Sequence, residues 1–101
     1  MKARNMIGER SGRPVANQFI VEDFGKVYFQ SYESLIAVVQ DNRITLGGDW
    51  NYSRTTLKYL YAFMREYVPN VWRKLPEAKS GAESIRKGIT CGLISYDPYL
   101  Q

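Results

Sequence analysis

The sequence predicts an α+β domain in which helices pack against a small antiparallel sheet at about residues 17–47. Short runs of β-branched and aromatic residues, separated by turn residues, indicate a meander of three or four strands. Apolar residues then recur with helical period at about residues 53–68, which predicts the main helix. A shorter pattern at about residues 81–91 predicts a C-terminal helix alongside it.

The meander is predicted from its turns as much as from its strands. The expected strands cover residues 18–22, 27–32, 34–40 and 44–46. Gly25 suits the first hairpin turn because glycine adopts positive φ without strain. Alternation along the second strand would place Tyr28 and Tyr32 on one face. The third run is the most apolar of the chain, so we expect a central strand that is covered on both faces.

The main helix has signals at both ends. Ser53 is a good N-cap, and Pro69 ends the helix because its ring and missing N–H prevent continuation. The apolar stripe consists of Leu57, Leu60, Tyr61, Met64 and Val68. A stripe of this kind predicts that the helix covers one face of the sheet.

The first 16 residues differ in character from the rest. They contain four basic residues and one acidic residue, and they show no clear hydrophobic period. Gly8, Gly12 and Pro14 interrupt the segment. We therefore expect residues 1–16 to form a loose basic arm and residues 17–101 to form a single α+β domain.

Composition excludes several classes of function. The chain has 101 residues, a net charge of +4, no histidine and a single cysteine, Cys91. Histidine is the commonest general base and metal ligand, so its absence argues against an enzyme and against a metal or cofactor. One cysteine cannot form an internal disulfide, and the N-terminus lacks the apolar run of a secretory signal, so we expect a cytoplasmic protein. The apolar runs are far shorter than the ~20 residues that span a bilayer, so no membrane partner is expected.

Basic and aromatic residues are the candidates for function. In a nucleic-acid-binding protein, Lys and Arg would neutralise phosphates while Tyr or Trp stack on bases. The candidate residues are Arg4, Arg10, Arg13, Tyr28, Tyr32, Trp50, Tyr52, Arg54 and Lys58. The most distinctive stretch is 49–56, where Arg54 stands at a helix N-terminus that could hold a phosphate. The structural alternative is that Trp50 and Tyr52 pack beneath the first turn of the helix, and that the strand tyrosines pack in the same way.

The same residues also support a function of another class. Aromatic residues and arginine dominate the binding energy of protein interfaces, so the chain could be a protein-binding module that modulates a host or phage protein. An edge strand in so small a sheet also permits a homodimer. The sequence favours a non-enzymatic, nucleic-acid-associated accessory protein, and a protein-binding module that inhibits or modulates a bacterial host protein is the alternative.

Two stretches of the chain resemble a known family. Residues 28–37 contain YFQSY and, after three residues, IA. Residues 52–58 contain YSRTT and, after one residue, a lysine. The chain resembles small uncharacterised proteins of bacteriophages and bacterial mobile elements, well over residues 17–67, weakly in the tail and not in the basic arm. The resemblance implies an α+β fold and a cytoplasmic setting in a bacterium, and it implies no particular activity.

Overall fold

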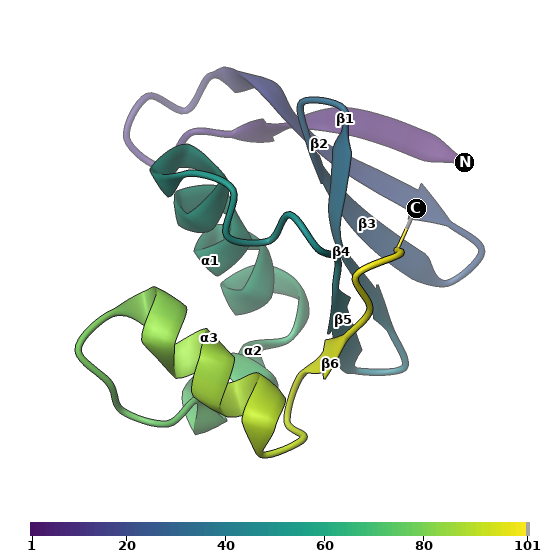
Figure 1. The fold of residues 1–101 in the computed structure, drawn as a ribbon. Helices are drawn as coiled ribbons and strands as arrows, with labels where there is room; N and C mark the ends of the chain where they lie inside the picture. Colours follow the sequence, from purple (N-terminus) through teal and green to yellow (C-terminus); the bar gives the residue numbers. More distant parts are fainter. Residues whose placement is uncertain (101) are drawn as a thin grey trace.

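The protein has two layers, a six-stranded sheet and three helices that lie on one of its faces (Figure 1). The computed structural model describes residues 1–100, and Gln101, the last residue of the predicted domain, lies outside them. The strands are β1 (Lys2–Ile7), β2 (Pro14–Asp23), β3 (Lys26–Ser31), β4 (Ser34–Gln40), β5 (Arg43–Leu46) and β6 (Ser95–Tyr96). The helices are α1 (Arg54–Tyr67), α2 (Pro69–Lys74) and α3 (Gly81–Thr90).

The strands follow one another across the sheet in chain order. Strands β1 to β5 are antiparallel, and the short β6 pairs with β5 in parallel. The predicted α+β class and the meander β2–β5 are confirmed, but the sheet has six strands where three or four were predicted. Strands β1 and β6 add one strand at each edge, and β6, with two residues, is too short for a sequence pattern.

The N-terminal segment is a strand, so the prediction of a loose arm over residues 1–16 was wrong. Strand β1 pairs with β2, with Ala3 opposite Val21 and Arg4 opposite Ile20. Only Met6 of this strand is buried, at 9% exposure, which explains why the segment shows no hydrophobic period. Pairing with β2 orders the segment, and a local sequence pattern does not reveal pairing between two strands.

Helix α1 begins at the predicted cap. The side chain of Ser53 accepts a hydrogen bond from the N–H of Thr56 at 3.1 Å. Phe63, which the predicted stripe omits, is fully buried, and its ring stacks on that of Phe29 with centroids 5.7 Å apart. This contact lays α1 across β3, and α1 ends before Pro69, which begins α2.

Helix α3 lies close to the predicted range and is capped by Ser80. Its Gly88 is buried, and a methyl group there would lie 3.0 Å from Ile94 and 3.1 Å from Leu75. The close approach holds α3 between the α2–α3 loop and the chain that leads into β6. Within residues 1–100, no helix is both long enough and apolar enough to span a membrane.

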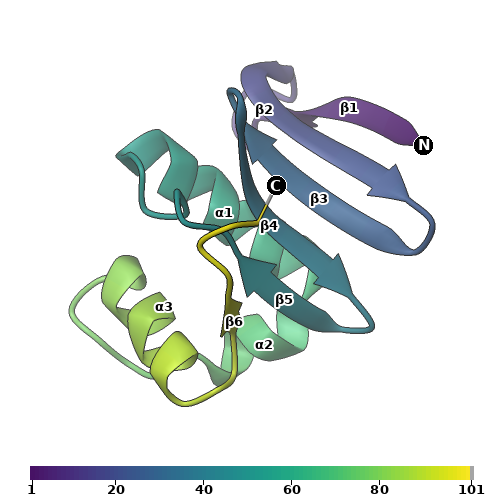
Figure 2. The same cartoon turned by 45° about the vertical axis from the view of Figure 1, so that its right-hand side comes forward.

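Strand β4 is covered on one face only, contrary to the prediction of a strand covered on both. Ile36, Ala37 and Val39 are buried in the core, whereas Leu35 and Val38 are half-buried. All three helices lie on the same side of the sheet in two views of the molecule (Figures 1 and 2). An apolar run therefore does not by itself show that both faces of a strand are buried.

Candidate functional site

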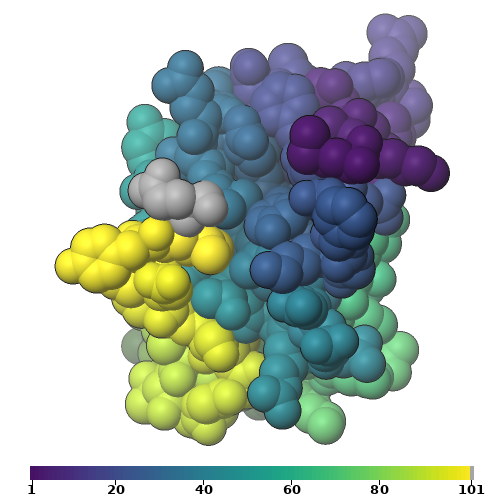
Figure 3. Space-filling view, turned by 90° about the vertical axis from the view of Figure 1, so that its right-hand side faces the viewer, coloured from purple at the N-terminus to yellow at the C-terminus, as the bar shows by residue number. Residues whose placement is uncertain are grey.

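Figure 3 shows the face of the sheet opposite the helices, and two rows of cross-strand neighbours form its centre. Residues that pair directly across neighbouring strands point to the same side, so the strand register gives the composition of each row. The first row consists of Ala3, Val21, Tyr28, Val38, Thr45 and Ser95. The second row consists of Asn5, Phe19, Gln30 and Leu35. We call these residues the open face.

The open face is uncharged and combines apolar with polar side chains. Tyr28 lies at its centre, between Val21 on β2 and Val38 on β4. Phe19 and Leu35 belong to the second row, and all five of these side chains are half-buried. Within residues 1–100, no helix covers them, because the helices pack on the opposite face. Such a surface can bury apolar area against a partner.

Charged residues lie beyond the rows, toward one end of the strands. Asp23 pairs with Lys26 across the β2–β3 hairpin, and Gln40 pairs with Arg43 across the β4–β5 hairpin. A hollow of about 610 Å³ lies between this end and the first row, lined by Val38, Gln40, Asp41, Arg43, Thr45 and Ser95. The surface therefore has an apolar centre and a charged margin, an arrangement that protein interfaces share.

The structure places the predicted aromatic candidates in different surroundings. Tyr28 lies on the open face, whereas Tyr32 lies in the β3–β4 turn with a φ of 55° and is exposed. Trp50 is buried in the core, as the structural alternative predicted, and the guanidinium of Arg86 lies 5.6 Å from its ring centroid. Tyr52 is 73% exposed and therefore does not pack beneath α1.

The predicted basic candidates do not gather around Tyr28. Arg4 points to the helix side of the sheet, because it pairs with the buried Ile20. Arg54 and Lys58 belong to α1, in the other layer, and the ammonium of Lys58 lies 5.3 Å from the ring centroid of Tyr59. The remaining two, Arg10 and Arg13, lie in the β1–β2 connection. The predicted site residues thus do not form one site.

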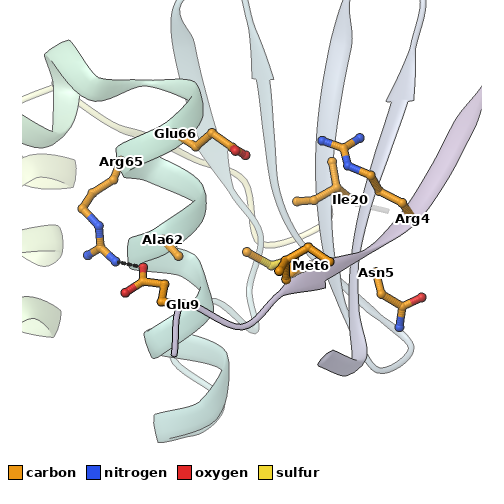
Figure 4. A pocket seen from close by; sticks show the side chains of 9 residues that line it. Arg4, Asn5, Met6, Glu9, Ile20, Ala62, Arg65 and Glu66 are labelled. Carbon is orange, nitrogen blue, oxygen red and sulfur yellow. Dashed lines mark hydrogen bonds and ion pairs between the residues drawn. The ribbon is translucent and has the colours of Figure 1, made fainter. Parts of the chain in front are cut away.

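A groove of about 360 Å³ lies between β1 and α1 (Figure 4). Its apolar lining comes from Met6, Ile7, Ile20 and Ala62. Its charged lining comes from Arg4, Glu9, Arg65 and Glu66. The groove lies on the helix side of the sheet and meets the open face at Asn5, which belongs to both surfaces.

Two ion pairs border the groove. Arg4 pairs with Glu22 at 3.0 Å and also donates a hydrogen bond to the hydroxyl of Tyr67. Burial lowers the pKa of Arg4, but Tyr67 and Glu22 outweigh this effect and raise the pKa overall. Arg65 pairs with Glu9 at 2.7 Å. These contacts tie β1 and the chain that follows it to α1.

Sequence reasoning missed most of the open face. Phe19 and Val21 lie in the first predicted strand, where Gln18 and Ile20 alternate with them. Because odd- and even-numbered positions of this strand both carry apolar residues, the sequence does not show which face is buried. The polar Gln18 suggests that its own face is exposed, yet Gln18 is fully buried. The strand register would have identified the rows, but register depends on long-range pairing. No sequence signal marked the groove.

The fold and the open face define a small two-layer α+β protein with an uncovered sheet. The chain belongs to DUF8033, a family of unknown function, which matches residues 1–75. The match includes β1, which the resemblance in sequence had left outside, and it ends before α3. The searches of curated proteins and of solved structures found no match. Within residues 1–100, no group of three or more Cys, Asp or Glu side chains is placed to hold a metal ion.

Proposed function

We propose that this chain is a non-enzymatic protein-binding module and that the open face is its contact surface. The observation that carries the proposal is the two cross-strand rows, in which no side chain is charged. Tyr28 provides a large side chain at the centre, and tyrosine is enriched among the residues that dominate interface energies. Charged residues are depleted from the centres of protein interfaces, and they are depleted here.

The distribution of charge favours a protein over a nucleic acid as the partner. Binding to a phosphate backbone requires Lys or Arg close to the surface that the strand follows. The cations nearest the open face are Lys26 and Arg43 at its margin, and Asp23 lies opposite Lys26. The net charge of +4 therefore does not fall on the face where the aromatic residues are.

The setting of this function is inferred from the resemblance stated above. The likeness of the chain to proteins of phages and mobile elements supports a partner inside a bacterial cell, either a host protein or a phage protein. A small accessory protein of this kind would inhibit or modulate the protein that it binds. A second copy of the chain is the remaining protein partner, because the open face presents no like charges that would repel it.

Site-specific photo-crosslinking in the native cell tests the proposal. A benzoylphenylalanine in place of Tyr28 lies on the open face, and the same residue in place of Tyr52 provides a matched control at an exposed tyrosine elsewhere. We expect a discrete protein adduct from position 28, of a partner or of a second copy, and none from position 52. Crosslinks to nucleic acid from position 28, or no adduct, would contradict the proposal.

A pair of lysine substitutions separates loss of binding from loss of folding. Val38→Lys introduces a charge into the first row, and Thr55→Lys introduces the same charge on an exposed residue of α1. We expect the adduct at position 28 to disappear with Val38→Lys and to persist with Thr55→Lys. Thermal unfolding of both variants shows whether each remains folded, and an adduct that survives Val38→Lys in a folded protein contradicts the role of the open face.

A further inference from the structure

The free edge of β1 adjoins the groove described above. Strand β1 has a neighbour on one side only, so the backbone N–H and C=O groups that point away from β2 have no strand partner within residues 1–100. The groove begins at this edge, because Arg4, Asn5, Met6 and Ile7 all line it. Ile7 is 56% exposed, although it is a large apolar residue. An edge strand beside a groove is the arrangement in which sheet proteins bind extended peptides.

Alternation decides which side chains of an added strand would enter the groove. Residues opposite Arg4 and Met6 would point to the helix side, since these two residues do so themselves. They would pass over Met6 and Ala62 and meet the surface of α1. Every second side chain of the added strand would therefore contact the apolar Met6 and Ala62 near its backbone and the charged groove-lining residues at its far end.

The charged residues that line the groove determine which side chain of an added strand would bind there. Arg4 and Arg65 are already paired, with Glu22 and Glu9 respectively. Glu66 is exposed on the groove and takes part in neither of the two ion pairs found in residues 1–100. In Figure 4 its carboxylate lies on the β1 side of α1, across from Arg65, which points toward Glu9. Within residues 1–100, Glu66 interacts with the hydroxyl of Tyr67 and forms no ion pair. A cation could therefore pair with its carboxylate, whereas an anionic side chain would have to break an existing ion pair.

We propose that the β1–α1 groove binds an extended peptide segment that adds to the free edge of β1 and places a lysine or arginine against Glu66. The aliphatic stem of that side chain would lie over Met6 and Ala62 while its charged end reaches the carboxylate. Backbone hydrogen bonds to β1 supply affinity, and the pair with Glu66 supplies selectivity. This site differs from the open face, because it uses the edge and the helix side of the sheet, and the two surfaces have Asn5 in common.

Selection from a random heptapeptide library displayed on phage, with the immobilised full chain as bait, tests this proposal. We expect enriched sequences with a basic residue flanked at two-residue spacing by apolar or β-branched residues. The charge-reversed bait Glu66→Lys should enrich acidic residues in the same place. Glu77→Lys, a matched reversal on an exposed residue of the α2–α3 loop, should enrich the same sequences as the wild type. No enrichment, or enrichment that ignores Glu66→Lys, overturns the proposal.

A synthetic peptide of the enriched sequence then tests strand addition itself. We expect Glu66→Lys to weaken its binding at least about tenfold, the effect of losing a charge-assisted contact and adding a repulsive charge. Methylation of the backbone nitrogens along one edge of the peptide should abolish binding, and methylation along the other edge should not. Equal binding of both methylated peptides would show that the segment does not add to β1.

Discussion

The Oγ of Ser31 and the Oγ1 of Thr56 lie 3.1 Å apart and form a buried hydrogen bond that joins β3 to the first turn of α1. Ser53 adds to this connection, since its hydroxyl donates to Oγ1 of Thr56 and accepts from the N–H of Thr56. Ser53 and Thr56 of the YSRTT stretch thus cap α1 and attach it to the sheet. The motif therefore has a structural role, while Tyr52 and Arg54 within it are exposed.

Thr56→Val should destabilise the protein by about 1–3 kcal/mol, because it leaves the hydroxyl of Ser31 buried without its partner. Urea unfolding followed by circular dichroism measures the change. Thr55→Val is the matched control: it makes the same substitution one residue earlier on an exposed position of α1. The control should cost less than about 0.5 kcal/mol. Equal effects of the two variants would show that the bond contributes nothing.

Gln18→Met should stabilise the protein by about 1–2 kcal/mol. Gln18 is fully buried, and neither its Oε1 nor its Nε2 has a hydrogen-bond partner within residues 1–100. Methionine has nearly the same shape and removes the cost of burying an unpaired amide. Gln40→Met, at the exposed end of β4, should change the midpoint of urea unfolding little. A loss of stability in Gln18→Met would indicate that the amide is satisfied in solution.

Local signals accounted for the helices and for the central meander. The cap at Ser53 and Pro69 set the bounds of α1, and the hairpin at Gly25 has the positive φ, 81°, that the turn requires. These features depend on residues close together in the chain. The edges of the sheet depend on distant ones: β1 contributes one buried residue and gains its order from β2.

The candidate site was less predictable for the same reason. Tyr28 was selected as an aromatic residue on a strand, and it is the member of the predicted set that lies on the open face. Trp50 was selected on the same chemical grounds, yet it is buried, because the β5–α1 loop turns it into the core. The type of a residue shows that it could contact a partner, but the register of β2, β3 and β4 determines which side chains lie on the same face.

Met6→Ala should cost about 2–3 kcal/mol of unfolding free energy, although it lies in a segment that the sequence suggested was loose. Its side chain belongs to the core, so truncation leaves a cavity. Ile7→Ala, at the adjacent position with 56% exposure, should cost less than about 1 kcal/mol. Chemical denaturation of both variants makes the comparison. Equally small effects would show that β1 is not part of the cooperative unit.

Oligonucleotide binding should be weak and nonspecific if the open face binds a protein. We expect dissociation constants no tighter than the roughly 10⁻⁴–10⁻⁶ M of nonspecific contacts, with steep loss as salt rises. Arg54→Ala should leave fluorescence anisotropy curves for single- and double-stranded DNA within about twofold of the wild type. Tight binding that Arg54→Ala removes, without any change in thermal unfolding, would restore the nucleic-acid alternative.

Stability should fall as the pH rises above about 10, the ordinary pKa of tyrosine. Burial raises the pKa of Tyr61 and of Tyr67, and Glu66 adds to the rise at Tyr67 while Arg4 opposes it. Above this pH the unfolded chain has lost phenolic protons that the folded chain retains. The stability that these two neutral phenols contribute is therefore fully present below about pH 10 and is lost as the pH rises through their pKa values in the folded protein. Urea unfolding between pH 8 and about 11 measures this slope. The double variant Tyr61→Phe with Tyr67→Phe should have a flatter slope, because neither phenol remains to titrate, and an unchanged slope would show that other groups control the alkaline transition.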